Sequence, residues 1–118
     1  MKAVLKELDT NGPISFDLFC PKESDLFGLW ITLHIGPSDA EGAHLYQLLI
    51  CTPDWLKQKS NESGAVWGRH MLIVPKFNKD RIRSEIERYI ESCEGSDFWE
   101  IAQQIARVAA WEFEDYRS

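Results

Sequence analysis

The fold of this 118-residue chain is decided by the stretch FGLWITLHI at residues 27–35. Phe27, Leu29, Ile31, Leu33 and Ile35 fall on one face of an extended chain, and Gly, Trp, Thr and His alternate with them. Strict alternation of this kind is the pattern of a half-buried β-strand. The turn-forming run GPSDAEG at 36–42 leads into HLYQLLICT at 44–52, whose alternate positions are apolar. The two stretches therefore predict a β-hairpin.

Toward the N-terminus, residues 2–8 also alternate and predict a short strand. Ala3, Leu5 and Glu7 would share one face of this strand, and Val4, Lys6 and Leu8 the other. Residues 9–26 contain two prolines and several polar residues, so we expect an irregular connection held by apolar anchors such as Phe16 and Phe19.

Beyond the hairpin, Thr52 and Pro53 are typical of a helix start, which predicts a short helix to about Lys59. Residues 65–74 are rich in β-forming residues and predict a strand that Pro75 ends. Apolar residues at helical spacing predict an amphipathic helix over 79–93. Asp97 and Glu100 resemble a capping box for a last helix that contains Ile101, Ala102, Ile105, Ala106, Val108 and Ala109.

This order lacks the strand–helix alternation of a parallel sheet. We therefore expect one α+β domain over residues 1–118. Its antiparallel sheet of about four strands would be packed on one face by two longer helices plus one short helix.

The composition limits the classes of partner. Nineteen acidic residues against thirteen basic ones give a net charge of -6, which disfavours nucleic acid and favours a basic protein partner. The sequence has no apolar run of the length of a membrane helix or a signal peptide, so we expect a cytoplasmic protein. Cys20, Cys51 and Cys93 lack metal-site spacing and are expected to be reduced, mostly buried thiols.

No catalytic motif or cofactor-binding motif is present, so we expect neither enzymatic activity nor a cofactor. Two alternatives stay open. His34 and His44 could meet across the hairpin and share a metal, so a small hydrolase or metal-binding enzyme using His34, His44 or His70 is one of them. The other is a homodimeric structural subunit, although a monomer or a weak homodimer is the expected state.

The segment WEFEDY at 111–116 is the main candidate for partner binding, because it combines aromatic anchors with carboxylates. A helix C-terminus favours cations, so the acids there indicate a role other than helix stability. In the alternative interpretation, Trp111 and Phe113 pack on the core and the acids only solvate the chain end. The predicted contact residues are Trp111, Glu112, Glu114, Asp115 and Tyr116, with Trp55 and Glu41 as weaker candidates.

Four motifs in order, CTPDWL at 51–56, GRHMLIV at 68–74, ESCEG at 91–95 and WEFEDY at 111–116, carry a resemblance to a known family. The chain resembles immunity protein 8, an α+β family associated with bacterial polymorphic toxins. The resemblance implies that the protein binds a cognate toxin directly and neutralises it. Toxins paired with such families are frequently nucleases with basic clefts, which an acidic protein would occlude. No residue role is carried over from the family.

Overall fold

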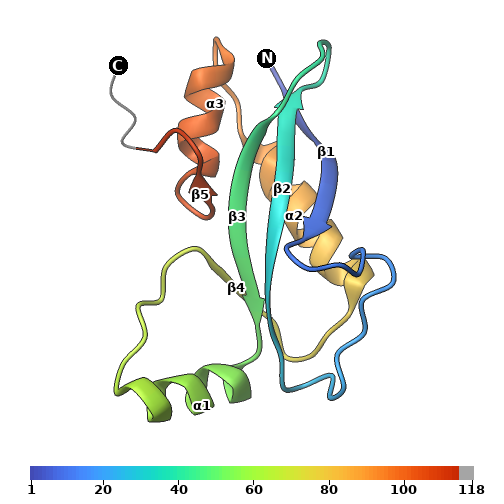
Figure 1. Ribbon diagram of the computed structural model, residues 1–118. Coiled ribbons are helices and arrows are strands. Elements are labelled where there is room, and N and C mark those ends of the chain that lie inside the picture. Colours follow the sequence, from blue (N-terminus) through green and yellow to red (C-terminus); the bar gives the residue numbers. More distant parts are fainter. Residues whose placement is uncertain (115–118) are drawn as a thin grey trace.

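The computed structural model describes residues 1–114 and confirms the α+β class (Figure 1). The strands are β1 (Ala3–Thr10), β2 (Gly28–Pro37), β3 (His44–Cys51), β4 (Met71–Ile73) and β5 (Ala110–Trp111). The helices are α1 (Pro53–Ser63), α2 (Lys79–Ser92) and α3 (Phe98–Ile105). No helix within this part of the chain combines the length and the apolar character that crossing a membrane requires.

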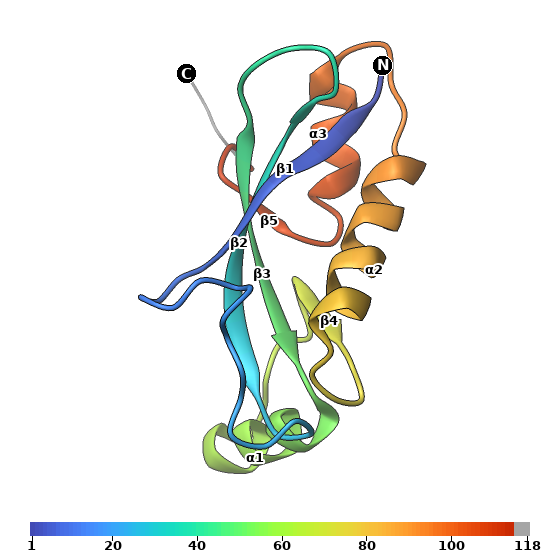
Figure 2. The same ribbon diagram turned by 90° about the vertical axis from the view of Figure 1, so that its right-hand side faces the viewer.

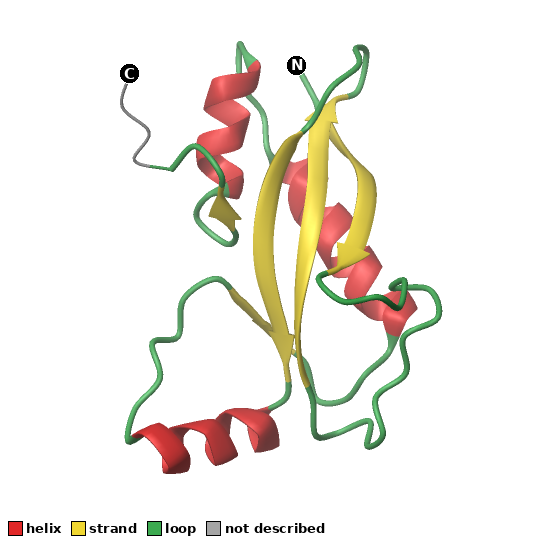
Figure 3. Ribbon diagram, in the orientation of Figure 1, coloured by secondary structure: helices red, strands yellow, loops and turns green. Residues whose placement is uncertain are grey.

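The predicted hairpin forms the centre of the sheet (Figure 3). β2 and β3 pair without a break from Gly28 opposite Cys51 to Ile35 opposite His44. β1 lies antiparallel on the free side of β2, whereas the free side of β3 is shared by β5 and β4. The sheet therefore has the order β1-β2-β3-β4, with β5 beside the first half of β3.

The main core lies between the sheet and α2 and α3, which both cover the same face (Figure 2). Ile31, Leu33 and Ile35 point into it from β2, as the alternation predicts, and each is at most 2% exposed. The helices contribute their buried stripes, Ile82, Ile86 and Ile90 from α2 and Ile101, Ala102 and Ile105 from α3. Phe16, an expected anchor of the 9–26 connection, is also buried there.

The prediction for the faces of β1 was wrong in its second half. The register shifts between Leu5 and Glu7, which marks a β-bulge at Lys6. A bulge inserts one extra residue and so reverses the side on which the following residues point. Leu8 is consequently buried with Ala3, and Glu7 and Asp9 lie on the sheet face away from the helices.

The prediction of an antiparallel sheet holds for three strand pairs but not for β4, which runs parallel to β3. The chain leaves the end of β3, passes through α1 and returns, so its next strand has the same direction as β3. The predicted strand over 65–74 is reduced to Met71–Ile73, because Gly64 ends α1 in a left-handed conformation and residues 65–69 are exposed.

The predicted helix lengths and positions also need correction. α1 is longer than expected and lies across one end of the sheet rather than on the face that α2 covers (Figure 1). α3 ends at Ile105, before the expected Ala106, Val108 and Ala109, because the chain turns there and forms β5 against β3.

Thr52 joins the start of α1 to the start of β2. Its buried hydroxyl accepts hydrogen bonds from the N–H groups of Trp55, at 3.4 Å, and Phe27, at 3.3 Å. Thr52→Val keeps the volume but leaves both donors without this acceptor, so it should lower the free energy of unfolding by about 1–3 kcal/mol. Urea denaturation measures this change. Thr52→Ser keeps the hydroxyl and should lose less than half as much; equal losses would contradict a role for the hydrogen bonds.

Candidate interaction site

The sheet face opposite α2 and α3 carries two rows of side chains across neighbouring strands. In the first row, Glu7 pairs with His34, His34 pairs with Leu45, and the N–H of Glu112 donates to the carbonyl of Leu45 at 3.0 Å. In the second row, Asp9 pairs with Thr32 and Thr32 with Gln47. We call this surface the open face: Glu7, Asp9, Trp30, Thr32, His34, Leu45 and Gln47, with Glu112 at its edge.

Apolar side chains are exposed on the open face. Trp30 is 46% exposed and Leu45 is 38% exposed, although both belong to the central strands. Val4 is exposed on β1 as well. Trp30 pairs with Leu49 and Leu45 pairs with His34, so the polar pair of Thr32 and Gln47 lies between the two apolar residues. Large apolar groups exposed among polar groups on a regular sheet are typical of a surface that another molecule covers.

Three polar side chains on the open face form a closed ring of hydrogen bonds. Thr32 donates its hydroxyl to the Asn11 carbonyl oxygen at 2.7 Å, and the Asn11 amide donates to the Gln47 carbonyl oxygen at 2.7 Å. The Gln47 amide donates in turn to the Thr32 hydroxyl at 2.8 Å. The ring ties the end of β1 to β2 and β3, so this part of the open face is held in one arrangement before any partner binds.

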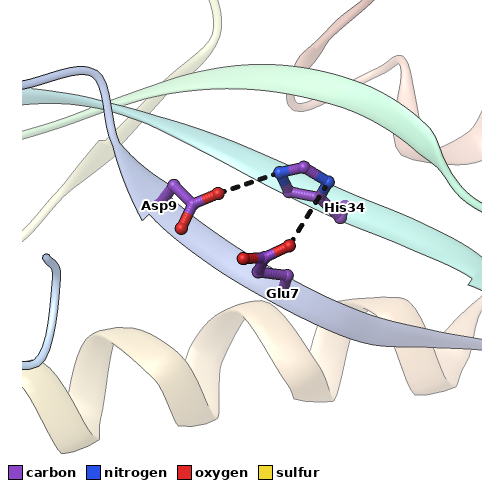
Figure 4. Close-up of side chains that lie close together, drawn as sticks. All are labelled: Glu7, Asp9 and His34. Atoms are coloured by element: carbon purple, nitrogen blue, oxygen red, sulfur yellow. Dashed lines mark hydrogen bonds and ion pairs between the residues drawn. The ribbon is translucent and has the colours of Figure 1, made fainter.

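Beside this ring, Glu7 and Asp9 of β1 flank His34 of β2 (Figure 4). The Nε2 atom of His34 is 3.1 Å from Oδ2 of Asp9, and its Nδ1 atom is 3.9 Å from Oε2 of Glu7. Within residues 1–114, neither carboxylate forms an ion pair with a lysine or arginine. The middle of the open face is therefore negative.

The alternative in which His34 and His44 meet across the hairpin and share a metal does not hold. His44 pairs with Ile35, so it shares the helix-covered side of the sheet, whereas His34 lies on the open face. The two imidazoles point to opposite sides and cannot hold one metal ion. His70 is at the entrance to β4, with a positive φ of 57°, and its carbonyl accepts the N–H of Leu49.

His44 sits instead in a cluster of aromatic rings with Phe98, Trp99, Trp111 and Phe113. The indole Nε1–H of Trp111 donates to His44 Nδ1 at 3.1 Å, so this nitrogen carries no proton. Burial lowers the pKa of His44, and the Glu112 carboxylate acts weakly in the opposite direction. Neutral His44 thus fastens the C-terminal turn to the sheet.

The predicted C-terminal residues have different environments. Trp111 is half-buried and stacks on His44 and Tyr46, which agrees with the alternative that it packs on the core. Glu112 is exposed, whereas Glu114 is partly buried and forms an ion pair with Arg69 at 2.9 Å. Asp115 and Tyr116 lie outside the described residues.

The two weaker candidates lie apart from each other. Glu41 is exposed in the turn between β2 and β3. Trp55, in α1, is half-buried and lies so close to Gly28 that a Cβ atom there would be 2.2 Å from its ring. Among the predicted residues up to position 114, Glu112 adjoins the open face through the hydrogen bond of its N–H to the Leu45 carbonyl.

Sequence reasoning missed most of the open face. The alternation in β2 could have indicated it, because Trp30, Thr32 and His34 lie between the core residues and so face the other side of the sheet. Trp67 is 92% exposed in the loop after α1, two residues before the Arg69 that binds Glu114.

This arrangement defines a class of protein: a small α+β protein with a covered core face and an open, acidic and partly apolar sheet face. A sequence model of the family described as immunity protein 8 matches residues 3–116. The chain belongs to the immunity protein 8 family, and the family supports an immunity role against polymorphic toxins. No curated protein and no solved structure matches the chain.

The contact between His44 and Trp111 predicts a pH dependence of stability. Because the pKa of His44 is lowered by folding, the unfolded chain binds its proton more readily, and the neutral form stabilises the fold above pH 6.5. This contribution should be lost as the pH falls through the lowered pKa. The free energy of unfolding, measured from pH 7.5 to 5, should therefore fall more in the wild type than in His44→Gln; identical slopes would contradict the assignment.

Proposed function

We propose that this protein is a cytoplasmic antidote that binds a cognate polymorphic toxin directly and blocks its active site with the open face. The membership of the immunity protein 8 family supports the immunity role. The single observation that supports the surface is the exposure of Trp30 and Leu45 on the same sheet face as the carboxylates of Glu7 and Asp9, with Glu112 at its edge. The protein itself needs no catalytic group for this action.

The charge of the open face indicates a basic toxin. Glu7 and Asp9 place two carboxylates on this surface and Glu112 a third at its edge, whereas one lysine, Lys6, passes Gly36 at the end of the surface toward the Ala40 carbonyl. A negative surface attracts a positive cleft, speeds the encounter and orients it, and toxins that cut nucleic acid have such clefts because they bind phosphates. A nuclease is therefore the proposed class of toxin.

Trp30 is the proposed anchor. A tryptophan contributes a large apolar area for few rotatable bonds, and such residues often dominate binding energy at interface centres. The ring of Asn11, Thr32 and Gln47 supports the sheet beside it, so little ordering is needed on binding. An interface of ordinary size takes about 20 residues from each side, so the proposed interface extends beyond the open face to the C-terminal turn and to the turn that holds Glu41.

The C-terminal residues are also proposed to contribute to toxin binding. Glu112 would contact the toxin from the edge of the open face, and Trp111 would hold the turn through its contact with His44. Glu114 would act through its ion pair with Arg69, which ties the turn to the loop that carries Trp67. Asp115 and Tyr116 continue the same segment and remain proposed contacts. Trp55, at the α1 end, stays a weaker one.

A charge-reversal pair tests the surface. Glu7→Lys combined with Glu112→Lys should slow association with the toxin at least about tenfold at low salt, because two attractive charges become repulsive. The matched control is Glu87→Lys with Glu91→Lys, which changes the net charge equally on exposed positions of α2. Stopped-flow or surface-binding kinetics give the rates. Equal slowing by both pairs would assign the effect to net charge and remove the open face from the proposal.

The immunity role is tested by expressing the chain together with the protein encoded beside its gene. Host cells should survive with the wild-type chain, and the two proteins should co-purify at low salt and separate more readily at high salt. Survival should fall with Trp30→Ala, whose folding is checked by urea denaturation. Death of the host despite abundant folded wild-type protein would contradict the proposed neutralisation of that neighbour.

A further inference from the structure

We infer that Glu7, Asp9 and His34 form a binding site for a zinc ion on the open face. The three residues each offer one ligand atom, and these atoms all lie within 4.8 Å of one another (Figure 4). Zinc holds nitrogen and oxygen ligands at about 2.0–2.2 Å, so tetrahedral ligands are about 3.4 Å apart. The observed 3.1 Å between His34 Nε2 and Asp9 Oδ2 is already close to that separation.

The backbone holds the ligands at this spacing. Glu7 and Asp9 are two positions apart on β1, so they point to the same side of the sheet, and His34 on β2 is the paired residue of Glu7. Because of the bulge at Lys6, the side chains of Glu7 and Asp9 point to the open face. Without the bulge, Glu7 and Asp9 would continue the row of Ala3 and Leu5 toward the helices. The ligands thus come from two hydrogen-bonded strands rather than from loops.

Of the three side chains, Glu7 has to move. The His34 side chain is only 27% exposed and lies between the two carboxylates, with Asp9 already at Nε2. The Glu7 side chain is 61% exposed, and its carboxylate, 3.9 Å from Nδ1, would turn toward the Nε2 side of the ring to share the ion with Asp9. A neutral imidazole and two carboxylates balance the double charge of zinc. In the described part of the chain, no lysine or arginine pairs with Glu7 or Asp9. A zinc ion at these carboxylates therefore breaks no lysine or arginine ion pair of the described residues.

The donor set points to zinc rather than calcium or magnesium. Those harder ions prefer six or more oxygen ligands or a shell of water, and an imidazole suits them poorly. Three protein ligands on an open sheet leave a fourth position toward solvent, as in zinc sites that accept a further ligand. That position faces the surface proposed to meet the toxin.

Titration of the full chain with zinc chloride in a calorimeter tests the site. The exposed thiol of Cys20 is replaced by serine to remove a competing ligand. We expect one zinc ion per chain, with affinity at least tenfold weaker in His34→Gln and in Asp9→Asn. His70→Asn is the matched control, because it removes an imidazole outside the cluster, and it should bind zinc like the parent.

A second measurement is independent of the affinity. Zinc should shift the NMR signals of the His34 ring and leave those of His44, on the other side of the sheet, unchanged. Circular dichroism confirms that each variant is folded. Absence of saturable binding up to about 1 mM zinc, or binding that His34→Gln leaves unchanged, would overturn the site.

The consequence for toxin binding rests on the proposed function. Zinc adds two positive charges to the middle of the open face, so it should slow association with a basic toxin several-fold at low salt, and His34→Gln should abolish this effect. The two proposals fail separately. Absence of any complex without zinc would contradict the toxin-binding role and leave the zinc titration of the isolated chain standing. A zinc effect that His34→Gln preserves would contradict only the proposed site.

Discussion

The structure depends on the main-chain hydrogen bonds of β3, which is paired along both of its edges. One edge is occupied by β2 over the whole strand. The other edge is divided between β5, opposite Tyr46 and Gln47, and β4, opposite Leu49 to Cys51. Buried N–H and C=O groups are costly when unpaired, so this one strand fixes three segments that are far apart in the sequence. The C-terminal turn is held against the sheet because β5 pairs with the part of the β3 edge that β4 does not reach.

The two faces of the sheet follow from this pairing. Each residue of β2 has its side set by the register with β3, so the core residues Ile31, Leu33 and Ile35 leave Trp30, Thr32 and His34 on the other side. Because α2 and α3 cover only the first side, the second stays accessible between β1 and the C-terminal turn. A rigid scaffold with one free face suits binding, since the cost of ordering is already met by folding.

The sequence predicted the regular parts well and the non-local parts poorly. β2, β3 and α2 were expected nearly at their observed bounds, because each shows a clear period over eight or more residues. The bulge at Lys6 was missed because strict alternation was assumed along residues 2–8; the shift buries the apolar Leu8 in place of Glu7. The direction of β4 and the early end of α3 were missed because both depend on which segments pair with the second edge of β3. Residues close to β4 or α3 in the sequence do not indicate that pairing. For the site, the aromatic and acidic composition and the helix-dipole argument favoured the C-terminal segment. The row from Glu7 through His34 to Leu45 appears only once the strands are paired.

The helix-dipole argument for the C-terminal acids does not hold in this structure. α3 ends at Ile105, and the chain then forms a turn and a strand before Glu112, so Glu112 and Glu114 are not in the last turn of a helix in the described part of the chain. Their environments separate them instead. Glu114 already has a cationic partner in Arg69, whereas Glu112 is exposed and joined by its main chain to Leu45. An acid with a partner is expected to order the chain, whereas Glu112, which forms no ion pair with a residue of the range 1–114, adds to the field that a basic molecule meets. The proposed role of Glu112 therefore rests on its position beside the open face and no longer on the dipole.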